Sequence, residues 1–244
     1  MKSLLLILTL LLLGSQPCAA AGKPAPATAH PVPVKVAFVL GNEVVPIDFA
    51  GPWDVFGSIH LPDQGQGMDA RMPFELYTVG AAKTPIRTSG NRRPGMAITP
   101  DYSFEDVPEP DLIVVPALAR TPGLSAWLRQ MHGRGKTIVA ICTGAFHLAD
   151  AGLLDGRTAT THRGAVEDLA RRYPKIKAVD GVRFVQDGTI YTSAGLSAGI
   201  DLAFHIVDQY YGRAVAQQAA DVLEYEGDGW ERPARPRQVM AAKE

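Results

Sequence analysis

The fold of this chain is decided by residues 137–145, which have the sequence TIVAICTGA. Residues 137–141 are apolar or β-branched, a composition typical of a strand buried on both faces of a parallel sheet. A helical pattern over residues 143–151 follows with almost no loop, and Gly152 ends it. Cys142 therefore lies at a sharp turn from a strand into a helix, where a side chain is forced outward above the sheet.

Apolar strand patterns alternate with helical patterns along the rest of the chain. Strands are expected at residues 34–40, 74–79, 111–115 and 158–161, and helices at 48–58, 126–132, 165–172, 197–211 and 214–224. Apolar runs at 182–185 and 189–192 flank Asp187-Gly188 and predict a β-hairpin, whereas residues 96–107 are expected to be irregular. This order predicts an α/β, flavodoxin-like, doubly wound fold: a mostly parallel sheet with helices on both faces and a small β-hairpin. Ligands of such sheets bind at the carboxyl ends of the strands, where Cys142 lies.

The beginning of the chain has the pattern of a secretory signal peptide. Lys2 precedes an apolar run at residues 4–13, and small residues at 19–21 follow, so we expect a cleaved leader over residues 1–21. The apolar run is about half as long as the ~20 residues of a membrane-spanning helix, and an uncleaved anchor or a buried helix is the alternative. We therefore expect a secreted or periplasmic protein without membrane attachment after leader cleavage.

Composition divides the remaining chain into three parts. Residues 22–33 are rich in Pro and Ala and are expected to be a disordered linker, residues 34–225 to form one α/β domain, and residues 226–244 to form a loose tail. The 24 Lys and Arg residues nearly balance the 25 Asp and Glu residues, which gives a net charge of −1. Without a basic surplus, a nucleic-acid partner is not expected.

The two cysteines of the chain are Cys18 and Cys142. Cys18 would leave with the leader, so Cys142 would be a lone thiol that cannot form an intramolecular disulfide. Cys142 is then either a buried, inert residue or a reactive thiol. No Cys and His residues have the spacing of a zinc site, and no phosphate-binding loop is present, so we expect no metal and no cofactor.

The position of Cys142 at the turn favours the reactive thiol. The N–H groups and the positive dipole end of a following helix would stabilise a thiolate, and Gly144 keeps the turn free of bulk. Cysteines at such positions have pKa values lowered to about 3.5–7.5. We therefore predict that Cys142 is a nucleophile with a lowered pKa.

Three further positions are expected near the same edge of the sheet. Asp48 follows the first strand and could share a proton with the thiol, although it could equally cap its helix. His162 follows a short strand and could act as a base or ion-pair partner, or be an ordinary surface histidine. Gly195 begins the sequence GLSAG, which could form an anion-binding turn at a helix start or let a helix pack closely.

Several of these segments together resemble a known family. They are DFAGPWD at 48–54, AICTG at 140–144, AGLLDGR at 151–157, TTH at 160–162 and AGID at 198–201. From Val34 to about Tyr225, the chain resembles the ThiJ/PfpI superfamily, which has the class I glutamine amidotransferase-like fold. It is most similar to isonitrile hydratases and to the amino-terminal domains of AraC-type transcription regulators.

The similarity to isonitrile hydratases implies a cofactor-independent enzyme acting on a small molecule, a lyase or alternatively a hydrolase. In this reaction Cys142 would attack the terminal carbon of an isonitrile to give a covalent thioimidate, which water converts into an N-substituted formamide. Asp48 would protonate or position the intermediate and water, and Thr143 would hold the acid or the substrate. The resemblance also implies a homodimer.

The chain departs from the family pattern at two places. The segment Pro116-Ala117-Leu118-Ala119 stands where many members have Pro-Gly-Gly, whose N–H groups help to build an anion hole beside the cysteine, so the amides of Ala117 and Leu118 are candidate site groups. His162 is not followed by x-Glu, so the amidotransferase triad is not visible and glutamine hydrolysis is disfavoured. Two other functions stay open: a small-ligand-sensing domain without catalysis, and a redox or stress-response protein in which Cys142 oxidises reversibly.

Overall fold

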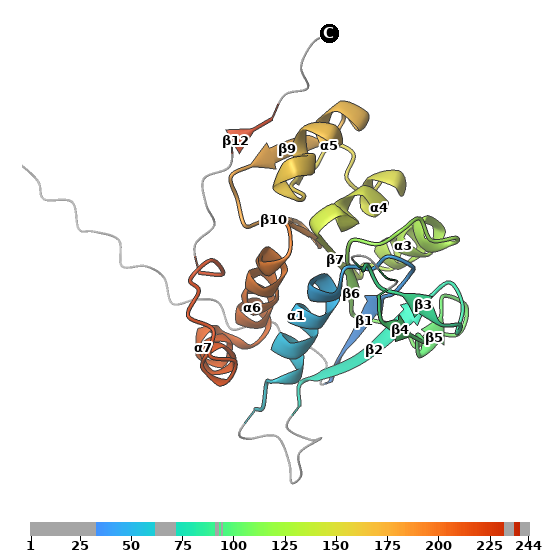
Figure 1. Cartoon of the computed structure of the whole chain (residues 1–244). Helices are drawn as coiled ribbons and strands as arrows, with labels where there is room; N and C mark the ends of the chain where they lie inside the picture. The colour runs from blue at the N-terminus through green and yellow to red at the C-terminus, as the bar shows by residue number, and fades with distance from the viewer. Residues whose placement is uncertain (1–32, 62–71, 91–92, 94, 232–236, 240–244) are drawn as a thin grey trace, which may run out of the picture.

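The computed structural model describes residues 33–61, 72–90, 93, 95–231 and 237–239 (Figure 1). The predicted signal peptide and almost all of the predicted linker lie outside these residues. Within the described ranges, no helix has both the length and the apolar character needed to cross a bilayer.

A seven-stranded sheet forms the centre of the domain, in the order β10-β11-β7-β6-β1-β2-β5. Its five central strands are parallel and run in the flavodoxin-like order: β2 (Phe74–Gly80), β1 (Val34–Val39), β6 (Leu112–Val115), β7 (Thr137–Ile141) and β11 (Ile190–Ser193). The short β5 (Tyr102–Ser103) extends one edge in parallel, and β10 (Phe184–Asp187) pairs antiparallel with β11 at the other. The predicted doubly wound sheet with a small hairpin is confirmed.

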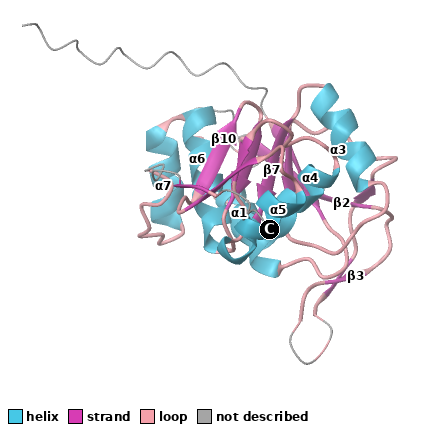
Figure 2. Ribbon diagram, turned by 90° about the horizontal axis from the view of Figure 1, so that it is seen from above, coloured by secondary structure: helices cyan, strands magenta, loops and turns pink. Residues whose placement is uncertain are grey.

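Helices cover both faces of this sheet (Figure 2). On one face lie α1 (Pro46–Gly57) and α6 (Ser197–Tyr211), with α7 (Arg213–Val222) packed against α6; on the other lie α3 (Leu124–Gly133), α4 (Ala145–Asp150) and α5 (Val166–Arg172). Strand β1 shows why its sequence is apolar throughout. Val36 and Phe38 belong to the core under α1 and α6, and Ala37 and Val39 to the core under α3 and α4.

Smaller elements flank the central sheet. Strands β8 (Thr158–Ala159), β9 (Lys177–Asp180) and β12 (Arg237–Gln238) form a separate sheet, and β3 (Ile86–Arg87) pairs with β4 (Ala97–Ile98). Residues 96–107, expected to be irregular, thus contribute two short strands. The described part of the expected loose tail also makes contacts, since Trp230 is 2% exposed and packs on Phe204. The free energy gained by burying a large aromatic ring outweighs the conformational entropy lost by ordering the segment.

Among the helix starts that differ from the sequence prediction, two matter for the site. Helix α1 begins at Pro46 instead of Asp48, since proline is well suited to a first helical position. The helix expected over 143–151 is a 3-10 turn, η1 (Cys142–Gly144), followed by the six-residue α4. Asp48 therefore lies inside the first turn of its helix, and only a short helix follows Cys142.

Candidate active site

The backbone of Cys142 is strained. Cys142 follows the last residue of β7 with a φ of 57°, in the left-handed region that costs a non-glycine residue about 1–3 kcal/mol. Two neighbours hold it there: Thr161 Oγ1 donates to the Cys142 carbonyl at 2.8 Å, and the Cys142 N–H donates to the Ala194 carbonyl at 3.3 Å. Cys142 is buried, with 6% of its surface exposed.

Close packing against β6 explains the glycine of the turn. A Cβ atom on Gly144 would lie 2.1 Å from the Val115 carbonyl oxygen, far inside van der Waals contact. Only glycine lets the cysteine turn approach the end of β6 so closely. This approach brings Cys142 beside the segment that follows β6, which contains Ala117 and Leu118.

Asp48 is fully buried at the same edge of the sheet. The Ala117 N–H donates to Asp48 Oδ2 at 3.2 Å, whereas no described residue makes a hydrogen bond of standard geometry to Oδ1. The residue at the cap of α1 is Val45, and Asp48 makes no capping hydrogen bond, so the capping alternative is wrong. A buried carboxylate oxygen without a hydrogen bond of standard geometry is uncommon and needs a functional explanation.

The thiol of Cys142 and the carboxyl of Asp48 influence each other's protonation. Burial raises the pKa of Asp48 from 3.8 to about 6; the Ala117 N–H, the Cys142 thiol, the Leu196 N–H and the charge of His162 limit this rise. Burial also raises the pKa of Cys142 to about 11, and the nearby negative charge of Asp48 adds to it. At neutral pH the proton therefore resides on sulfur and the charge on the carboxylate.

The predicted lowering of the Cys142 pKa is wrong. The N–H groups of Thr143 and Leu196 do lower it, as donors at a helix start should, but burial and the Asp48 charge outweigh them. The short α4 offers little dipole to offset these effects. The Thr143 side chain makes no hydrogen bond with any described residue, so its described contribution to the site is its N–H.

Leu196 is a site residue that sequence reasoning missed. It precedes α6 with a φ of 57° and a ψ of −112°, so it is strained like Cys142, and its N–H lies near both the thiol and the Asp48 carboxylate. Nothing in the sequence marks a leucine for a left-handed conformation. The only signal was the neighbouring Gly195, which indicated a turn at this place.

His162 and Gly195 contact each other at the margin of the site. A Cβ atom on Gly195 would lie 2.3 Å from His162 Cδ2, so glycine is required where the imidazole ring packs. His162 Nδ1 accepts from the Gly164 N–H at 3.2 Å. His162 acts on the site through its charge interaction with Asp48, without a hydrogen bond to the thiol.

The amides of Ala117 and Leu118 have different roles. The Ala117 N–H holds Asp48, and the Ala117 carbonyl accepts from the Val45 N–H at 2.9 Å. The Leu118 N–H has no hydrogen-bond partner among the described residues. The Leu118 side chain reaches toward Gly41, since its Cδ1 lies 2.8 Å from where a Gly41 Cβ would be. Of the two amides, that of Leu118 is the one available to a ligand.

No three His, Cys, Asp or Glu side chains of the described ranges are grouped so that they could hold a metal ion. The chemistry that the described groups can supply consists of a nucleophilic sulfur, a carboxyl that exchanges a proton near neutral pH, and N–H donors that stabilise negative charge.

Curated relatives of this chain include an enzyme and transcription regulators. Isonitrile hydratase of Pseudomonas putida is 32% identical over 198 residues, which cover 79% of this chain and 78% of that protein. The HTH-type transcriptional regulator CdhR of Pseudomonas aeruginosa is 38% identical over 153 residues, which cover 61% of this chain but only 44% of the regulator.

Solved structures share the same fold. A ThiJ/PfpI family protein from Pseudomonas syringae aligns with a TM-score of 0.67 at 24% identity and covers 86% of this chain and 84% of that one. Drosophila melanogaster DJ-1beta aligns with a TM-score of 0.66 at 20% identity, over 80% of this chain and 99% of that one. The sequence profile of the DJ-1/PfpI family matches residues 34–209, nearly the whole α/β domain. The chain belongs to the DJ-1/PfpI family.

Proposed function

We propose that this chain is a cofactor-independent hydratase, which adds water to a small isonitrile through a covalent intermediate on Cys142. The observation that carries the proposal is the buried Asp48 carboxylate beside the thiol, with a pKa raised to about 6. A group with this pKa can take up and return a proton near neutral pH, as general acid–base catalysis requires. The 32% identity to isonitrile hydratase supports the choice of substrate class.

In the first step, the Cys142 sulfur attacks the terminal carbon of the isonitrile. The Asp48 carboxylate takes the thiol proton as the carbon–sulfur bond forms, and then delivers this proton to the same carbon. The product is a thioimidate, R–N=CH–S–Cys142, and the carboxylate is regenerated. The N–H groups of Thr143 and Leu196 would stabilise the negative charge that develops on sulfur.

In the second step, water adds to the thioimidate carbon while Asp48 accepts a proton from it. Asp48 passes that proton to the substrate nitrogen, which gives the intermediate R–NH–CH(OH)–S–Cys142. The remaining hydroxyl proton then moves through Asp48 to the sulfur as the carbon–sulfur bond breaks, which releases the formamide R–NH–CHO and restores the Cys142 thiol. One isonitrile and one water are consumed for each formamide, and the reaction requires neither an oxidant nor a reductant. The Leu118 N–H is the available donor for the oxygen that water contributes.

An exposed apolar side chain next to the reactive pair favours an apolar substituent on the substrate. Leu196, whose N–H lies near the thiol and the carboxylate, is 44% exposed. Ligand sites commonly combine such apolar surface with a few polar groups. We also propose that the protein acts outside the cytoplasm, because residues 1–21 have the signal-peptide pattern, and that it forms a homodimer, as the resemblance implies.

The proposal is tested by incubating the full chain with a small alkyl isonitrile and measuring formamide by NMR. We expect formamide from the wild type, none above background from Cys142→Ser, and a loss of ~100-fold or more with Asp48→Asn. Asp54→Asn is the matched control, since Asp54 is an exposed acid of the same helix and should retain full activity. Folded wild-type protein that forms no formamide, or Cys142→Ser protein that forms it at the wild-type rate, contradicts the proposal.

A ligand-sensing domain without catalysis is the second candidate, which the 38% identity to CdhR favours. It predicts that a small ligand raises the melting temperature of both wild type and Cys142→Ala and that no product forms. A redox role is less favoured, because a thiol with a pKa of about 11 forms little of the thiolate that peroxide oxidises. Mass spectrometry of Cys142 after mild peroxide treatment tests this third function.

A further inference from the structure

The strained conformation of Leu196 needs an external support. Positive φ values occur at four described non-glycine residues. One of them is Cys142, which carries the reactive thiol, and another is Leu196, whose N–H lies near the thiol and the Asp48 carboxylate. The Leu196 side chain is 44% exposed, so its own packing cannot hold the backbone in a costly conformation. Bonds from neighbouring residues must therefore maintain it.

Arg183, which precedes β10, contacts the residues on both sides of Leu196. The Arg183 carbonyl accepts from the Ala194 N–H at 2.9 Å, and its Nη2 donates to Ser197 Oγ at 3.2 Å. The main chain of Arg183 thus binds one end of the turn at 194–197, and its guanidinium binds the other end. The guanidinium also pairs through Nε and Nη2 with Asp201 on α6.

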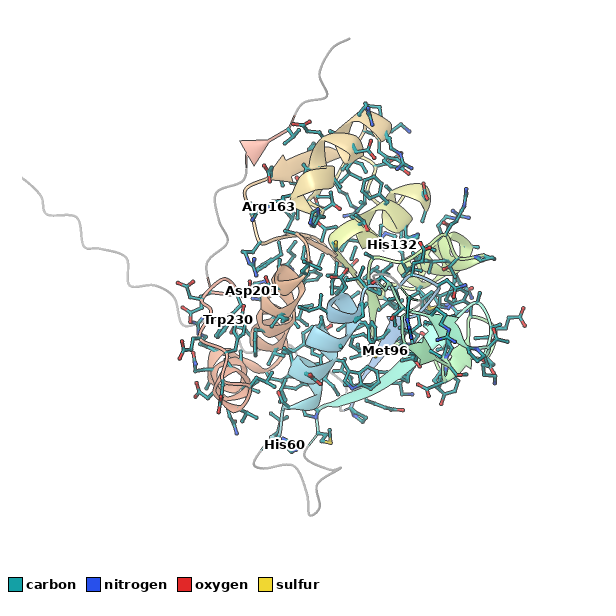
Figure 3. The ribbon with its side chains drawn as sticks, viewed as in Figure 1. His60, Met96, His132, Arg163, Asp201 and Trp230 are labelled. Carbon is teal, nitrogen blue, oxygen red and sulfur yellow. The ribbon has the colours of Figure 1, made fainter. Side chains whose placement is uncertain are left out.

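Asp201 fixes the guanidinium in place. Figure 3 shows Asp201 on α6, facing the C-terminal segment that carries Trp230. Its side chain is 1% exposed, and the Tyr225 hydroxyl donates to Oδ1 at 2.8 Å. A carboxylate buried this deeply needs its cation, because an unpaired buried charge is strongly unfavourable. Arg183 is therefore held rigidly against the turn.

The start of α6 does not itself require this arrangement. The Ala198 N–H donates to the Gly195 carbonyl at 3.2 Å and the Gly199 N–H to the Leu196 carbonyl at 2.9 Å, so local bonds already close the first turn. The Leu196 N–H takes no part in these bonds and lies near the reactive pair.

We propose that Arg183 is a positioning residue that holds the 194–197 turn so that the Leu196 N–H points at the Cys142 sulfur and the Asp48 carboxylate. The proposal rests on the proposed function, in which this pair is the reactive centre. A merely structural role for Arg183 would affect folding stability alone, whereas a positioning role also changes the reactivity of the thiol.

Thiol reactivity is measured as the rate of iodoacetamide alkylation of Cys142 in the full chain, by peptide mass spectrometry between about pH 7 and pH 10. Arg183→Met should slow alkylation at a fixed pH by ~3–10-fold, which corresponds to a rise of about 0.5–1 in the pKa of the thiol. Ser197→Ala, which keeps the ion pair, should slow it by ~2-fold. Arg157→Met is the matched control: Arg157 pairs with Asp187 at 2.9 Å at the other end of β10 and should leave the rate unchanged.

If Arg183→Met fails to fold, the double variant Arg183→Met/Asp201→Asn, which removes both charges of the ion pair, is tested in its place, alongside Ser197→Ala. A folded Arg183 variant with the wild-type alkylation profile overturns the proposal, and so does an equal shift in Arg157→Met. Because alkylation needs no turnover, a chain that forms no formamide but shows the Arg183 effect rejects only the hydratase function. Normal formamide formation without the shift rejects only the positioning role.

Discussion

Replacing Asp48 with asparagine should make this protein more stable at high pH. Asp48 is fully buried, and burial raises its pKa from 3.8 to about 6. About 2 pKa units at about 1.4 kcal/mol each correspond to about 3 kcal/mol of folding free energy that is lost when the carboxyl ionises. An asparagine carries no charge and has no such loss.

The sign of the effect follows from proton binding. Between about pH 4 and pH 6 the folded protein binds more protons at Asp48 than the unfolded chain does, so this contribution to wild-type stability falls as pH rises. Asparagine can still accept the Ala117 N–H, as the neutral carboxyl does at low pH. We expect Asp48→Asn to be about as stable as wild type near pH 4 and more stable by about 2–3 kcal/mol near pH 8.

Urea unfolding of both proteins at several pH values between about 4 and 8 measures this difference. Other carboxyl groups titrate equally in the two proteins and cancel from the comparison, and Asp54→Asn shows whether loss of any acid from α1 has the same effect. A difference in the free energy of unfolding between Asp48→Asn and wild type that stays constant over the whole pH range would refute the reasoning. Ionisation of the buried carboxyl would then not destabilise the folded protein.

Three further outcomes follow from the geometry of the site. Gly144→Ala should lower the free energy of unfolding by about 1–3 kcal/mol in urea, since the new Cβ would lie 2.1 Å from the Val115 carbonyl oxygen; a fully stable variant would show that the turn can move away from β6. Thr161→Val should cost about 1–2 kcal/mol and slow formamide formation, because the 2.8 Å bond that holds the Cys142 carbonyl is lost; unchanged values of both quantities would remove Thr161 from the support of the turn. The rate of formamide formation should fall below about pH 6, where Asp48 becomes protonated and can no longer accept the thiol proton; a rate that is flat from pH 5 to pH 8 would exclude Asp48 as the base.

The sequence predicted the central fold well because the relevant signals are local. Strand β7 and helix α6 have the predicted bounds, since a doubly buried strand is a continuous apolar run and a long helix repeats its apolar face. The two-residue strand β8 was predicted as one of the strands that alternate with helices in the main sheet, but it lies in a separate sheet. A stretch this short does not specify its pairing partner.

The proximity of Cys142 and Asp48 was predicted from the sequence, but the electrostatics of this pair were not. The strand order brings Cys142 and Asp48 to one edge of the sheet, which sequence periodicity could indicate. The pKa of the thiol depends on burial and on the distance to a carboxylate 94 positions earlier in the chain, and no local pattern contains either quantity. For the same reason, the sequence did not distinguish the Ala117 amide, which binds Asp48, from the free Leu118 amide.

The pairing of the Cys142 thiol with the Asp48 carboxylate can be measured directly as the pKa of Cys142 in wild type and in Asp48→Asn. The pH dependence of iodoacetamide alkylation, followed on the Cys142 peptide, gives this value. In the wild type it should be about 11, and loss of the neighbouring negative charge should lower it by about 1 unit. Alkylation near pH 8 should then be ~10-fold faster in Asp48→Asn even though formamide formation is lost. An unchanged or slower alkylation would contradict the pairing, because the carboxylate would then exert no influence on the sulfur.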